Sequence, residues 1–456
     1  MSHLHFMGIG GVSMQGLARW WHADGHRVSG CDAVDGAATR ALRALGIDVW
    51  HGHDPAHLDH DVDTLVTTMA VPRDHPEVLR AHALGIRVLP RIALLAELFE
   101  RRRSIGITGT HGKSTTTGLT AALTLAAGVD PSVQIGATFP GLEHNVRYGN
   151  GPLLVAEVDE SDPGFAQLRP TIAVVTNLED DHVAGDFDER RNYHASMADL
   201  EQATARFVAG AEHALYCADW PALRTLVAGH PSAVRYGTAE DAEYRVTRME
   251  LAGDGSRFEL RLPDLRTLEV TLAIPGHHNV LNAAAALAAV HLAGLDPLPL
   301  APALRDFHGV GRRWQRWGEV DGALIVDDYA HHPTEVAATL ASARHSGRRV
   351  RAVLQPHRWV RTARHWPALA DAAATADEVL VLDVYASGES AIAGVSSGLI
   401  VQRLRERGVQ ASQHDIDSAV AYLRASLAPG DLVLTLGAGD VWRVAEALAT
   451  PERRDP

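Results

Sequence analysis

The chain has 456 residues, enough for about two to four domains, and its formal net charge of −14 at pH 7 argues against a nucleic-acid-binding surface. No apolar run approaches the ~20 residues of a membrane-spanning helix, and the N-terminus lacks the basic and apolar regions of an export signal, so we expect a cytoplasmic protein without membrane insertion. The two cysteines, Cys31 and Cys217, are too few for a disulfide framework or a zinc ribbon.

Residues 1–102 alternate strand-like and helix-like stretches, which is typical of βαβ units and predicts a parallel sheet. The string GIGGVSMQG lies between the first predicted strand and helix and resembles a dinucleotide-binding fingerprint, although serine occupies the third glycine position. An aspartate ends the next predicted strand, where a ribose-binding acid would lie. We expect the helix N-terminus to hold a diphosphate, and a tight turn without a ligand is the alternative. The candidate residues are Gly10, Gly11, Val12, Ser13 and Asp32.

The string GITGTHGKSTTT in the next segment follows a short apolar strand, Ser104–Thr108, and leads into a helix-like run, which is the context of a phosphate loop. Of the 42 lysine and arginine residues only Lys113 is a lysine, and a compact ammonium fits a glycine loop around phosphate oxygens better than a planar guanidinium. We expect Lys113 to reach the β- and γ-phosphates of ATP and Ser114 to hold Mg²⁺. A chance glycine turn is the alternative, because Ile107 stands where the common pattern has glycine. The other candidate residues of the loop are Gly109, Thr110, His111, Gly112 and Thr115.

Two acidic strings end apolar strands of the buried parallel type in the same segment. EVDESD contains Glu157, Asp159, Glu160 and Asp162, and LEDDH spans residues 178–182. Open α/β sheets bind ligands at the carboxyl ends of their parallel strands. Glu157 is suited to Mg²⁺ held on a triphosphate, and His182 to a second, looser metal site. Solvated acidic loops are the alternative for either string alone.

The sequence strongly predicts a helix at residues 279–294, after a region in which it predicts antiparallel strands. At its start His278 could stack on an adenine and Asn279 could hydrogen-bond it, with an ordinary capped helix as the alternative. Residues 308–456 return to the α/β rhythm, and their strand ends collect histidine, aspartate, tyrosine and arginine, which is typical of a ligand site. These residues are Arg312, Arg313, Asp327, Asp328, Tyr329, His331, His332, His357, Arg358 and Arg361.

Together these motifs resemble the Mur ligase family of ATP-dependent amide-forming enzymes over nearly the whole chain. The matching strings, in order, are GIGGVSM, SGCD, HPEV, GTHGKSTTT, EVDESDPGF, TNLEDDH, GHHNVLNA, GRRW, DDYAHHPTE, QPHRWVRT, LDVYASGE and GAGD. The resemblance implies an α/β protein of three domains. These are a Rossmann-like domain at 1–102 for a UDP-sugar, a central P-loop ATPase domain with a parallel sheet at 103–307, and a Rossmann-like domain at 308–456 that completes the site.

The resemblance also implies roles for individual residues. Catalytic roles fall on Lys113, Glu157, His182, His331 and Arg361. Metal binding falls on Ser114, Glu157 and His182, and ATP binding on the phosphate loop with His278, Asn279, Arg312 and Asp327. UDP-sugar binding extends from the first glycine loop to Thr68, Glu160 and Ser161, and amino-acid binding falls on His331, Arg358 and Arg361.

The reaction implied is the ATP- and Mg²⁺-dependent joining of L-alanine to the lactyl carboxylate of UDP-N-acetylmuramate through an acyl phosphate, by a monomer or homodimer. Several relatives carry a carbamylated lysine that this chain lacks, as expected of the L-alanine branch. One alternative is the branch that attaches a recycled tripeptide to the same sugar, which favours tyrosine where Ser161 stands. A distant alternative is a non-catalytic nucleotide-binding or NAD-dependent protein. The family's Ser-Ser-Ala and Asn-Pro-Glu strings read Thr68-Met69-Ala70 and His75-Pro76-Glu77 here, so details of the uridine pocket are expected to differ.

Overall fold

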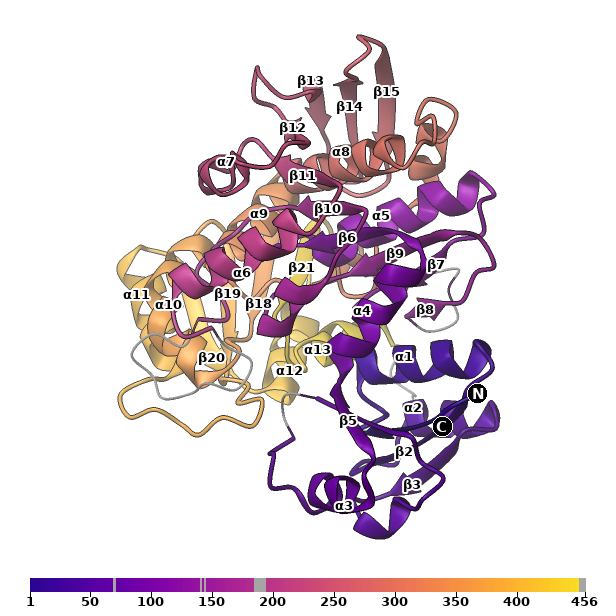
Figure 1. Ribbon diagram of the computed structural model, residues 1–456. Helices are drawn as coiled ribbons and strands as arrows, with labels where there is room; N and C mark the ends of the chain where they lie inside the picture. Colours follow the sequence, from indigo (N-terminus) through magenta and orange to yellow (C-terminus); the bar gives the residue numbers. More distant parts are fainter. Residues whose placement is uncertain (69–70, 140–141, 143–144, 184–193, 451–456) are drawn as a thin grey trace. The chain divides into compact units, whose positions relative to one another are not determined.

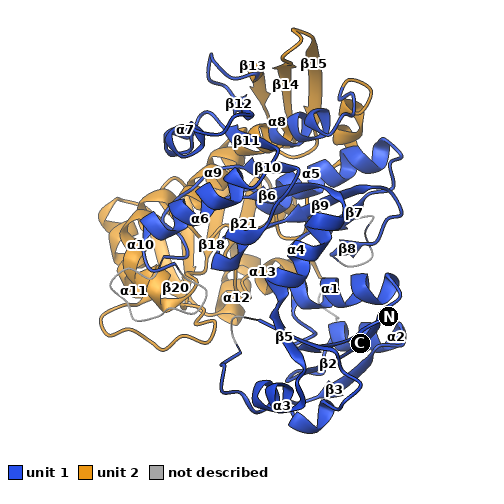
Figure 2. Cartoon of the chain, in the orientation of Figure 1, with its two compact units in different colours: residues 1–243, 285–297 blue, residues 244–284, 298–456 orange. Residues whose placement is uncertain are grey.

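The computed structural model describes residues 1–68, 71–139, 142, 145–183 and 194–450, and for Val12 the backbone alone. The chain divides into two compact units, unit 1 with residues 1–243 and 285–297, and unit 2 with residues 244–284 and 298–456 (Figure 2). Both units contain parallel strands connected by helices, so the predicted α/β fold class is confirmed. The predicted domain boundaries at 102/103 and 307/308 remain predictions, since the division by compactness groups the residues differently.

The first sheet of unit 1, drawn in indigo and violet in Figure 1, is parallel with the strand order β3-β2-β1-β4-β5. Its strands are β1 (His3–Met7), β2 (Arg27–Asp32), β3 (Asp48–His51), β4 (Thr64–Thr67) and β5 (Arg87–Pro90). The helical segments are α1 (Val12–Ala23), α2 (Ala37–Ala44), η1 (Pro55–His57), α3 (Pro76–Leu84) and α4 (Arg91–Arg101). The central strand β1 is buried along its whole length, yet it contains His3 and His5. Buried imidazoles need polar partners, so this face of the sheet is not an ordinary apolar core.

The second sheet of unit 1 has the order β12-β11-β10-β6-β9-β7-β8, with parallel pairs except for β7 and β8. Its strands are β6 (Arg103–Thr108), β7 (Ser132–Gln134), β8 (Val146–Arg147), β9 (Leu153–Glu157), β10 (Ile172–Val175), β11 (His213–Cys217) and β12 (Ala233–Gly237). The helical segments are α5 (Lys113–Ala126), η2 (Pro163–Gln167), α6 (Met197–Ala209) and α7 (Pro221–Val227). Since β6, β9 and β10 are parallel neighbours, the polar residues that follow them meet at one edge of the sheet.

Unit 2 contains a set of antiparallel strands and a separate, mostly parallel sheet with connecting helices. The strands β13 (Tyr244–Leu251), β14 (Ser256–Arg261) and β15 (Thr267–Leu272) are antiparallel, and α8 (His277–Leu292) begins in this unit. The last sheet has the order β16-β17-β21-β18-β19-β20 and is parallel except for β16 with β17. Its strands are β16 (Gln315–Val320), β17 (Ala323–Asp328), β18 (Arg349–Leu354), β19 (Glu378–Leu382), β20 (Gln410–His414) and β21 (Asp431–Leu436).

Helices cover both faces of this last sheet. The helical segments of the region are η3 (Ala301–Asp306), α9 (Pro333–Arg344), α10 (Trp359–Ala373), α11 (Ser397–Glu406), α12 (Ile416–Ser426) and α13 (Trp442–Ala449). One apolar cluster packs α9, α10 and α11 on one face, and a second cluster packs α12 and α13 on the other. The carboxyl ends of β17, β18 and β21 are thereby fixed next to one another, which positions the polar residues that follow these strands.

Candidate functional site

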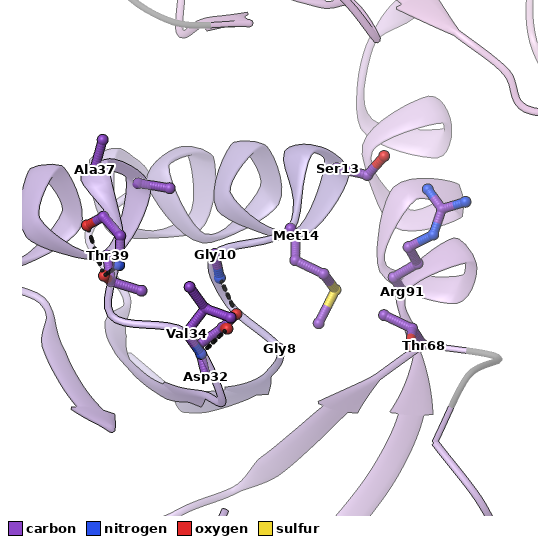
Figure 3. Close-up of a pocket in the computed structure, with 13 residues that line it drawn as sticks. Gly8, Gly10, Ser13, Met14, Asp32, Val34, Ala37, Thr39, Thr68 and Arg91 are labelled. Carbon is purple, nitrogen blue, oxygen red and sulfur yellow. Dashed lines mark hydrogen bonds between the residues drawn. The ribbon is translucent and has the colours of Figure 1, made fainter. Parts of the chain in front are cut away.

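A pocket of about 660 Å³ opens at the carboxyl ends of β1 and β2, beside the N-terminus of α1 (Figure 3). The predicted residues Gly10, Gly11, Ser13, Asp32 and Thr68 all line it. The free N–H groups of a helix N-terminus favour an anion, so the pocket suits a phosphate-bearing ligand. The side chain of Val12, and all of Met69 and Ala70, lie outside the described residues.

Asp32 fixes the shape of this pocket. Its Oδ2 accepts a hydrogen bond of 2.8 Å from the Gly10 N–H, and its Oδ1 accepts one of 2.9 Å from the Val34 N–H. A Cβ atom on Gly10 would lie 2.9 Å from Asp32 Oδ2, so only glycine brings the loop this close to the carboxylate. In this structure the Asp32 carboxylate therefore ties the glycine loop to the end of β2.

The phosphate loop connects β6 to α5, as its string predicts. Gly109 has a φ of +128° and Gly112 a φ of +82°, which are conformations that favour glycine. A Cβ atom on Gly109 would lie 2.2 Å from Thr176 Oγ1, so glycine is also required there for space. The loop ends at Gly112 as the N-cap of α5, which leaves the first N–H groups of that helix directed at the loop.

Residues that follow β10 hold the phosphate loop in place. Asn177 Oδ1 accepts from the His111 N–H at 2.7 Å, and Thr176 Oγ1 donates to the His111 carbonyl at 2.6 Å. The Glu179 N–H donates to Thr110 Oγ1 at 2.9 Å, and the Glu179 carboxylate contacts His111 Nε2 at 2.8 Å. The loop is thus preorganised by side chains from the adjacent strand end, as binding a phosphate chain requires.

Lys113 is the positive centre of the loop. Its Nζ donates to the Gly109 carbonyl at 2.7 Å and the Thr110 carbonyl at 3.1 Å, and it pairs with Glu160 Oε2 at 2.8 Å. Burial would lower the pKa of Lys113, but the charges of Glu160 and Asp159 outweigh it and raise that pKa. Burial raises the pKa of Glu160 to about 7 against the opposing charge of Lys113. The ammonium is therefore charged at neutral pH.

Ser114 and Glu157 form a pair of oxygen donors beside the loop. Ser114 Oγ donates to Glu157 Oε1 at 2.9 Å, and the Gly136 N–H donates to Glu157 Oε2 at 2.6 Å. A Cβ atom on Gly136 would lie 2.8 Å from the carboxylate, so this glycine makes room for it. A hydroxyl and a carboxylate at the end of a phosphate loop are the hard oxygen ligands that Mg²⁺ prefers, so these residues fit the predicted metal.

The acidic string after β9 links the phosphate loop to other charged side chains. Asp159 Oδ1 accepts from Ser161 Oγ at 2.7 Å, and Arg91 lies 3.6 Å from Asp159 Oδ2. Burial opposes ionisation of Asp159, but Lys113 and His182 lower its pKa. His182 also lies 3.6 Å from Asp181 Oδ2. The structure thus connects His182 to the loop electrostatically, through Asp159.

The start of α8 carries the two residues predicted to meet a base. Asn279 is buried, its Nδ2 donates to the Pro275 carbonyl at 2.7 Å, and its Oδ1 accepts from Asn282 at 3.3 Å. Burial, followed by the charges of His277 and Arg313, lowers the pKa of His278 to about 4, so this imidazole is neutral and able to stack. In this structure Asn279 holds the turn that begins the helix.

Arg312 forms an ion pair with the buried Asp327 at the end of β17. Arg312 Nε donates to Asp327 Oδ2 at 3.0 Å, and Thr435 Oγ1 donates to Asp327 Oδ1 at 2.6 Å. The guanidinium also donates to the carbonyls of Gly437 at 2.7 Å and Gly439 at 2.9 Å. These bonds join the GRRW and GAGD strings around one arginine, which is held with a φ of +59°.

Asp328 is buried next to this pair and accepts from the Trp314 N–H at 2.8 Å and the Ala330 N–H at 2.9 Å. Burial raises the pKa of Asp328 to about 6, while Arg313 and the two N–H groups act in the opposite direction. The folded protein thus holds a proton here at a pH where the unfolded chain has lost it, so this group lowers stability as the pH rises toward 6.

We expect Asp328→Asn to remove this pH dependence. As the pH rises from about 4 to about 7, the melting temperature of the wild type should fall relative to that of the variant. The corresponding loss in the free energy of unfolding is on the order of 2–3 kcal/mol. Thermal unfolding of both proteins across this range measures it, with the exposed Asp254→Asn in the same unit as the control. A pH-independent difference between wild type and variant would contradict the assignment.

A cluster of histidine and arginine lies at the ends of β17 and β18. His331 packs edge-on against Tyr329 and His357, with ring centroids 5.4 and 5.7 Å away. Arg361 is buried and lies with Nη1 3.1 Å from His357 Nδ1. Arg358 is the N-cap of α10 and has a φ of +66°, and its Nε lies 3.9 Å from Glu389 Oε1. The structure therefore brings His331 and Arg361 together around His357, as the strand-end pattern predicts.

Sequence reasoning missed several residues that build these sites. Arg91 lines the first pocket and contacts the acidic string, and its signal is an arginine at the junction of a strand and a helix. Asn177 anchors the phosphate loop from within the TNLEDDH string, and its signal is an amide at the end of the strand next to that loop. Glu335 accepts from the His331 N–H at 3.1 Å, one helical turn away in the chain.

Three family models match consecutive parts of the chain. "Mur ligase family, catalytic domain" matches residues 3–103, "Mur ligase middle domain" matches residues 107–290, and "Mur ligase, glutamate ligase domain" matches residues 312–439. Across the described residues, none of the helices combines the length and apolar character needed to cross a bilayer.

Known proteins resemble the chain over nearly its full length. A UDP-N-acetylmuramate–L-alanine ligase of Deinococcus radiodurans is 48% identical over 97% of this chain and 92% of its own. The ligase of the same name from Xanthomonas campestris is 40% identical over 98% of this chain and 95% of its own. The crystal structure of a UDP-N-acetylmuramate–alanine ligase from Thermotoga maritima superposes with a TM-score of 0.81 at 28% identity, covering 98% of each chain. With three family models in register along the chain, this protein belongs to the Mur ligase family.

Proposed function

We propose that this protein joins L-alanine to the lactyl carboxylate of UDP-N-acetylmuramate at the expense of ATP, in the synthesis of a peptidoglycan precursor. The chain is an ATP-dependent ligase of its family. The observation that carries the chemistry is the phosphate loop with Lys113 in its centre and the Ser114–Glu157 pair beside it. The substrates are inferred from the names of the full-length relatives.

The first step transfers the γ-phosphoryl group of ATP to the lactyl carboxylate, which gives an acyl phosphate and ADP. Such a transfer depends on positioning and on neutralising the charge of the phosphoryl oxygens. Lys113 supplies a buried positive charge for this purpose, and it would exchange part of its contact with Glu160 for phosphate oxygens. Ser114 and Glu157 would hold Mg²⁺, with His182 as the candidate for a second ion, and Mg²⁺ would supply further charge neutralisation.

In the second step the amine of L-alanine attacks the acyl carbon, and inorganic phosphate leaves. The UDP-sugar would occupy the pocket of Figure 3, with its diphosphate at the N-terminus of α1 and with Arg91 as a cation in the same pocket. Glu160 and Ser161 follow the strand next to the phosphate loop and are proposed to lie near the sugar acid. The adenine is assigned to His278 and Asn279, and the nucleotide phosphates to Arg312. Asp327, which accepts a hydrogen bond from Arg312, is a further proposed ATP-binding residue.

Arg361, with Arg358 and His331, is the proposed binding group for the L-alanine carboxylate, because an arginine can hold a carboxylate by two parallel hydrogen bonds. We expect Arg361→Ala to raise the KM for L-alanine about tenfold or more, as loss of a charge-assisted hydrogen bond would, and to change the KM for ATP far less. Steady-state kinetics with each substrate varied in turn measures the two values. Arg364→Ala on the same helix is the control. Equal effects on both KM values would contradict this placement.

The function is tested by competition between amine acceptors. With UDP-N-acetylmuramate and ATP present, L-alanine and the recycled tripeptide are supplied at equal concentration and the UDP-linked products are separated. We expect the L-alanine product to dominate, and glycine and L-serine to react detectably but poorly, since a pocket separates neighbouring small side chains by only about 10–200-fold. Preference for the tripeptide would overturn the assignment of L-alanine as the acceptor, and only the assignment to the Mur ligase family would remain. Release of ADP that requires neither the sugar nor the amine would contradict the proposed ligase reaction. The proposed compartment is the cytoplasm, where the nucleotide substrates are made.

A further inference from the structure

Four potential metal ligands converge on the face of the first sheet that packs against α3. They are His5 on the central strand β1, Cys31 on β2, His57 in η1 and Glu77 in the first turn of α3. One ligand atom from each lies within 4.8 Å of every other. None of these four side chains is assigned a step in the proposed ligase reaction, although Cys31 and Glu77 lie in the SGCD and HPEV strings.

The sheet register explains why the two strand residues meet. His5 pairs with Ser29 and Met7 pairs with Cys31 across the parallel strands β1 and β2. Alternate residues of a strand point to the same face, so His5 and Cys31 lie on the face that packs against α3. The loop after β3 brings His57 over them, where it stacks on Trp50 with ring centroids 5.1 Å apart.

Two of the distances between donor atoms match those of a tetrahedral site. Glu77 Oε1 lies 3.3 Å from Cys31 Sγ and 3.5 Å from His57 Nδ1. Zinc bonds of about 2.0–2.3 Å to nitrogen, oxygen and sulfur place the ligands of one tetrahedron roughly 3.3–3.8 Å apart. Glu77 Oε2 lies 3.2 Å from His53 Nδ1, and the same nitrogen lies 3.2 Å from Cys31 Sγ, so His53 contacts two of the four ligands.

An unsatisfied nitrogen provides independent evidence for a ligand. His5 is 0% exposed, its Nδ1 bonds Ser29 Oγ at 2.9 Å, and its Nε2 has no hydrogen-bond partner among the described residues. A buried polar atom without a partner is rare and is explained by a water or an ion that completes the site. His57 Nδ1, which faces Glu77, also has no hydrogen-bond partner in the described part of the chain.

Ser29 supplies the outer support that a metal-bound histidine requires. Its Oγ lies 2.9 Å from His5 Nδ1 and 2.8 Å from His3 Nε2, and the His3 N–H donates to Asp63 at 2.7 Å. This chain of bonds is satisfied when His5 Nδ1 carries the proton and donates it to Ser29. The unshared electron pair of His5 is then on Nε2, and a hydrogen bond at the second ring nitrogen is the usual arrangement for a histidine that binds metal.

We propose that His5, Cys31, His57 and Glu77 bind one zinc ion, which would stabilise the fold of the first sheet. Two imidazoles, one thiolate and one carboxylate are a zinc-type ligand set, and a set with sulfur and nitrogen does not suit Mg²⁺. The charges of the thiolate and the carboxylate would together balance that of Zn²⁺, which removes the penalty for burying them. The four protein ligands would close the coordination sphere, as in structural sites.

Metal binding would displace one proton. Burial, together with the Glu77 carboxylate, raises the pKa of the Cys31 thiol well above its usual range, so the metal-free thiol is neutral. Zn²⁺ binding would form the zinc–sulfur bond and release the thiol proton to solvent. Burial, with His57 and His3, lowers the pKa of His5 to about 3, so its ring is already in the neutral form that binds metal.

The test uses the full-length chain without an affinity tag, stripped with a chelator, reloaded with ZnCl₂ and desalted. Elemental analysis should find about one tightly bound zinc per chain. We expect Cys31→Ser and His57→Gln each to weaken zinc binding by at least about 10²-fold, since loss of even an outer partner weakens a site 10–100-fold. Cys217→Ser, which removes the other cysteine, and His60→Gln, an exposed histidine three residues from His57, are the matched controls and should keep the metal.

Loading with Co²⁺ tests whether a cysteine binds the metal. A cysteine ligand distinguishes this site from metal binding by the many other histidines of the chain. A cobalt-bound thiolate gives a sulfur-to-metal charge-transfer band in the near ultraviolet, and only a site that includes a cysteine can produce it. The band should be present in the wild type, Cys217→Ser and His60→Gln, and absent in Cys31→Ser. His57 is only partly buried, so His57→Gln keeps the test valid if Cys31→Ser fails to fold.

The proposal is overturned if the wild type holds no zinc after desalting, if the cobalt protein lacks the band, or if Cys31→Ser binds zinc as tightly as the wild type. These outcomes do not depend on ligase activity, because the readouts are metal content and absorbance.

Discussion

Replacing Lys113 by arginine should lower the ligase turnover number by on the order of 10²-fold or more, although the positive charge is kept. The Lys113 ammonium occupies a narrow space, bounded by the Gly109 and Thr110 carbonyls and the Glu160 carboxylate. A planar guanidinium is wider and presents its donors in a fixed fork, so it would push the loop outward and displace the phosphates. Single-turnover formation of ADP, with sugar and L-alanine at saturating concentration, measures the effect.

Lys113→Met is the comparison that separates shape from charge. If the arginine variant is nearly as slow as the methionine variant while both keep the wild-type melting temperature, geometry is the cause. An arginine variant with near-normal turnover would show that the loop does not hold phosphate in the way its structure suggests.

Glu157→Ala should raise the Mg²⁺ concentration needed for half-maximal rate by on the order of tenfold or more and should slow phosphoryl transfer. The change removes the carboxylate that accepts hydrogen bonds from Ser114 Oγ and the Gly136 N–H, so a hard oxygen ligand and the support of a second one are lost together. His182→Ala should have a milder effect, because the structure connects this residue to the loop through Asp159. A Mg²⁺ titration of the initial rate measures both variants.

Glu269→Ala is the control for loss of a carboxylate, since Glu269 is exposed on β15. Unchanged titration curves for Glu157→Ala and His182→Ala alike would remove the metal-site assignment. An unfolded Glu157→Ala protein, detected by circular dichroism, would instead indicate that the carboxylate is needed to hold the Gly136 turn.

The local sequence determined those features that depend on neighbouring residues in the chain. The glycines of the phosphate loop, the lysine that follows and the strand and helix on either side lie within one short string, so their arrangement is fixed by backbone conformation. The pattern of apolar runs predicted the α/β class, and the fold confirms it. Family membership could be read from the order of the motifs, and the family models confirm it.

Tertiary structure decided which distant side chains meet these motifs. Parallel pairing of β6 with β10 brings Asn177 and Glu179 onto the phosphate loop, and pairing with β9 brings Glu160 onto Lys113. The roles of the individual site residues and the two domain boundaries remain predictions.

The cluster of His5, Cys31, His57 and Glu77 is the clearest case of a site that only the tertiary structure reveals. The two cysteines exclude a zinc ribbon, but that rule concerns only cysteines at short spacing in the chain. Two strands, a loop and a helix from separate parts of the first sheet supply the four ligand atoms. Each residue taken alone is an ordinary core or surface side chain. Only the register of β1 and β2 and the packing of α3 bring them within 4.8 Å, because contacts between distant segments are set by the fold and not by local propensity.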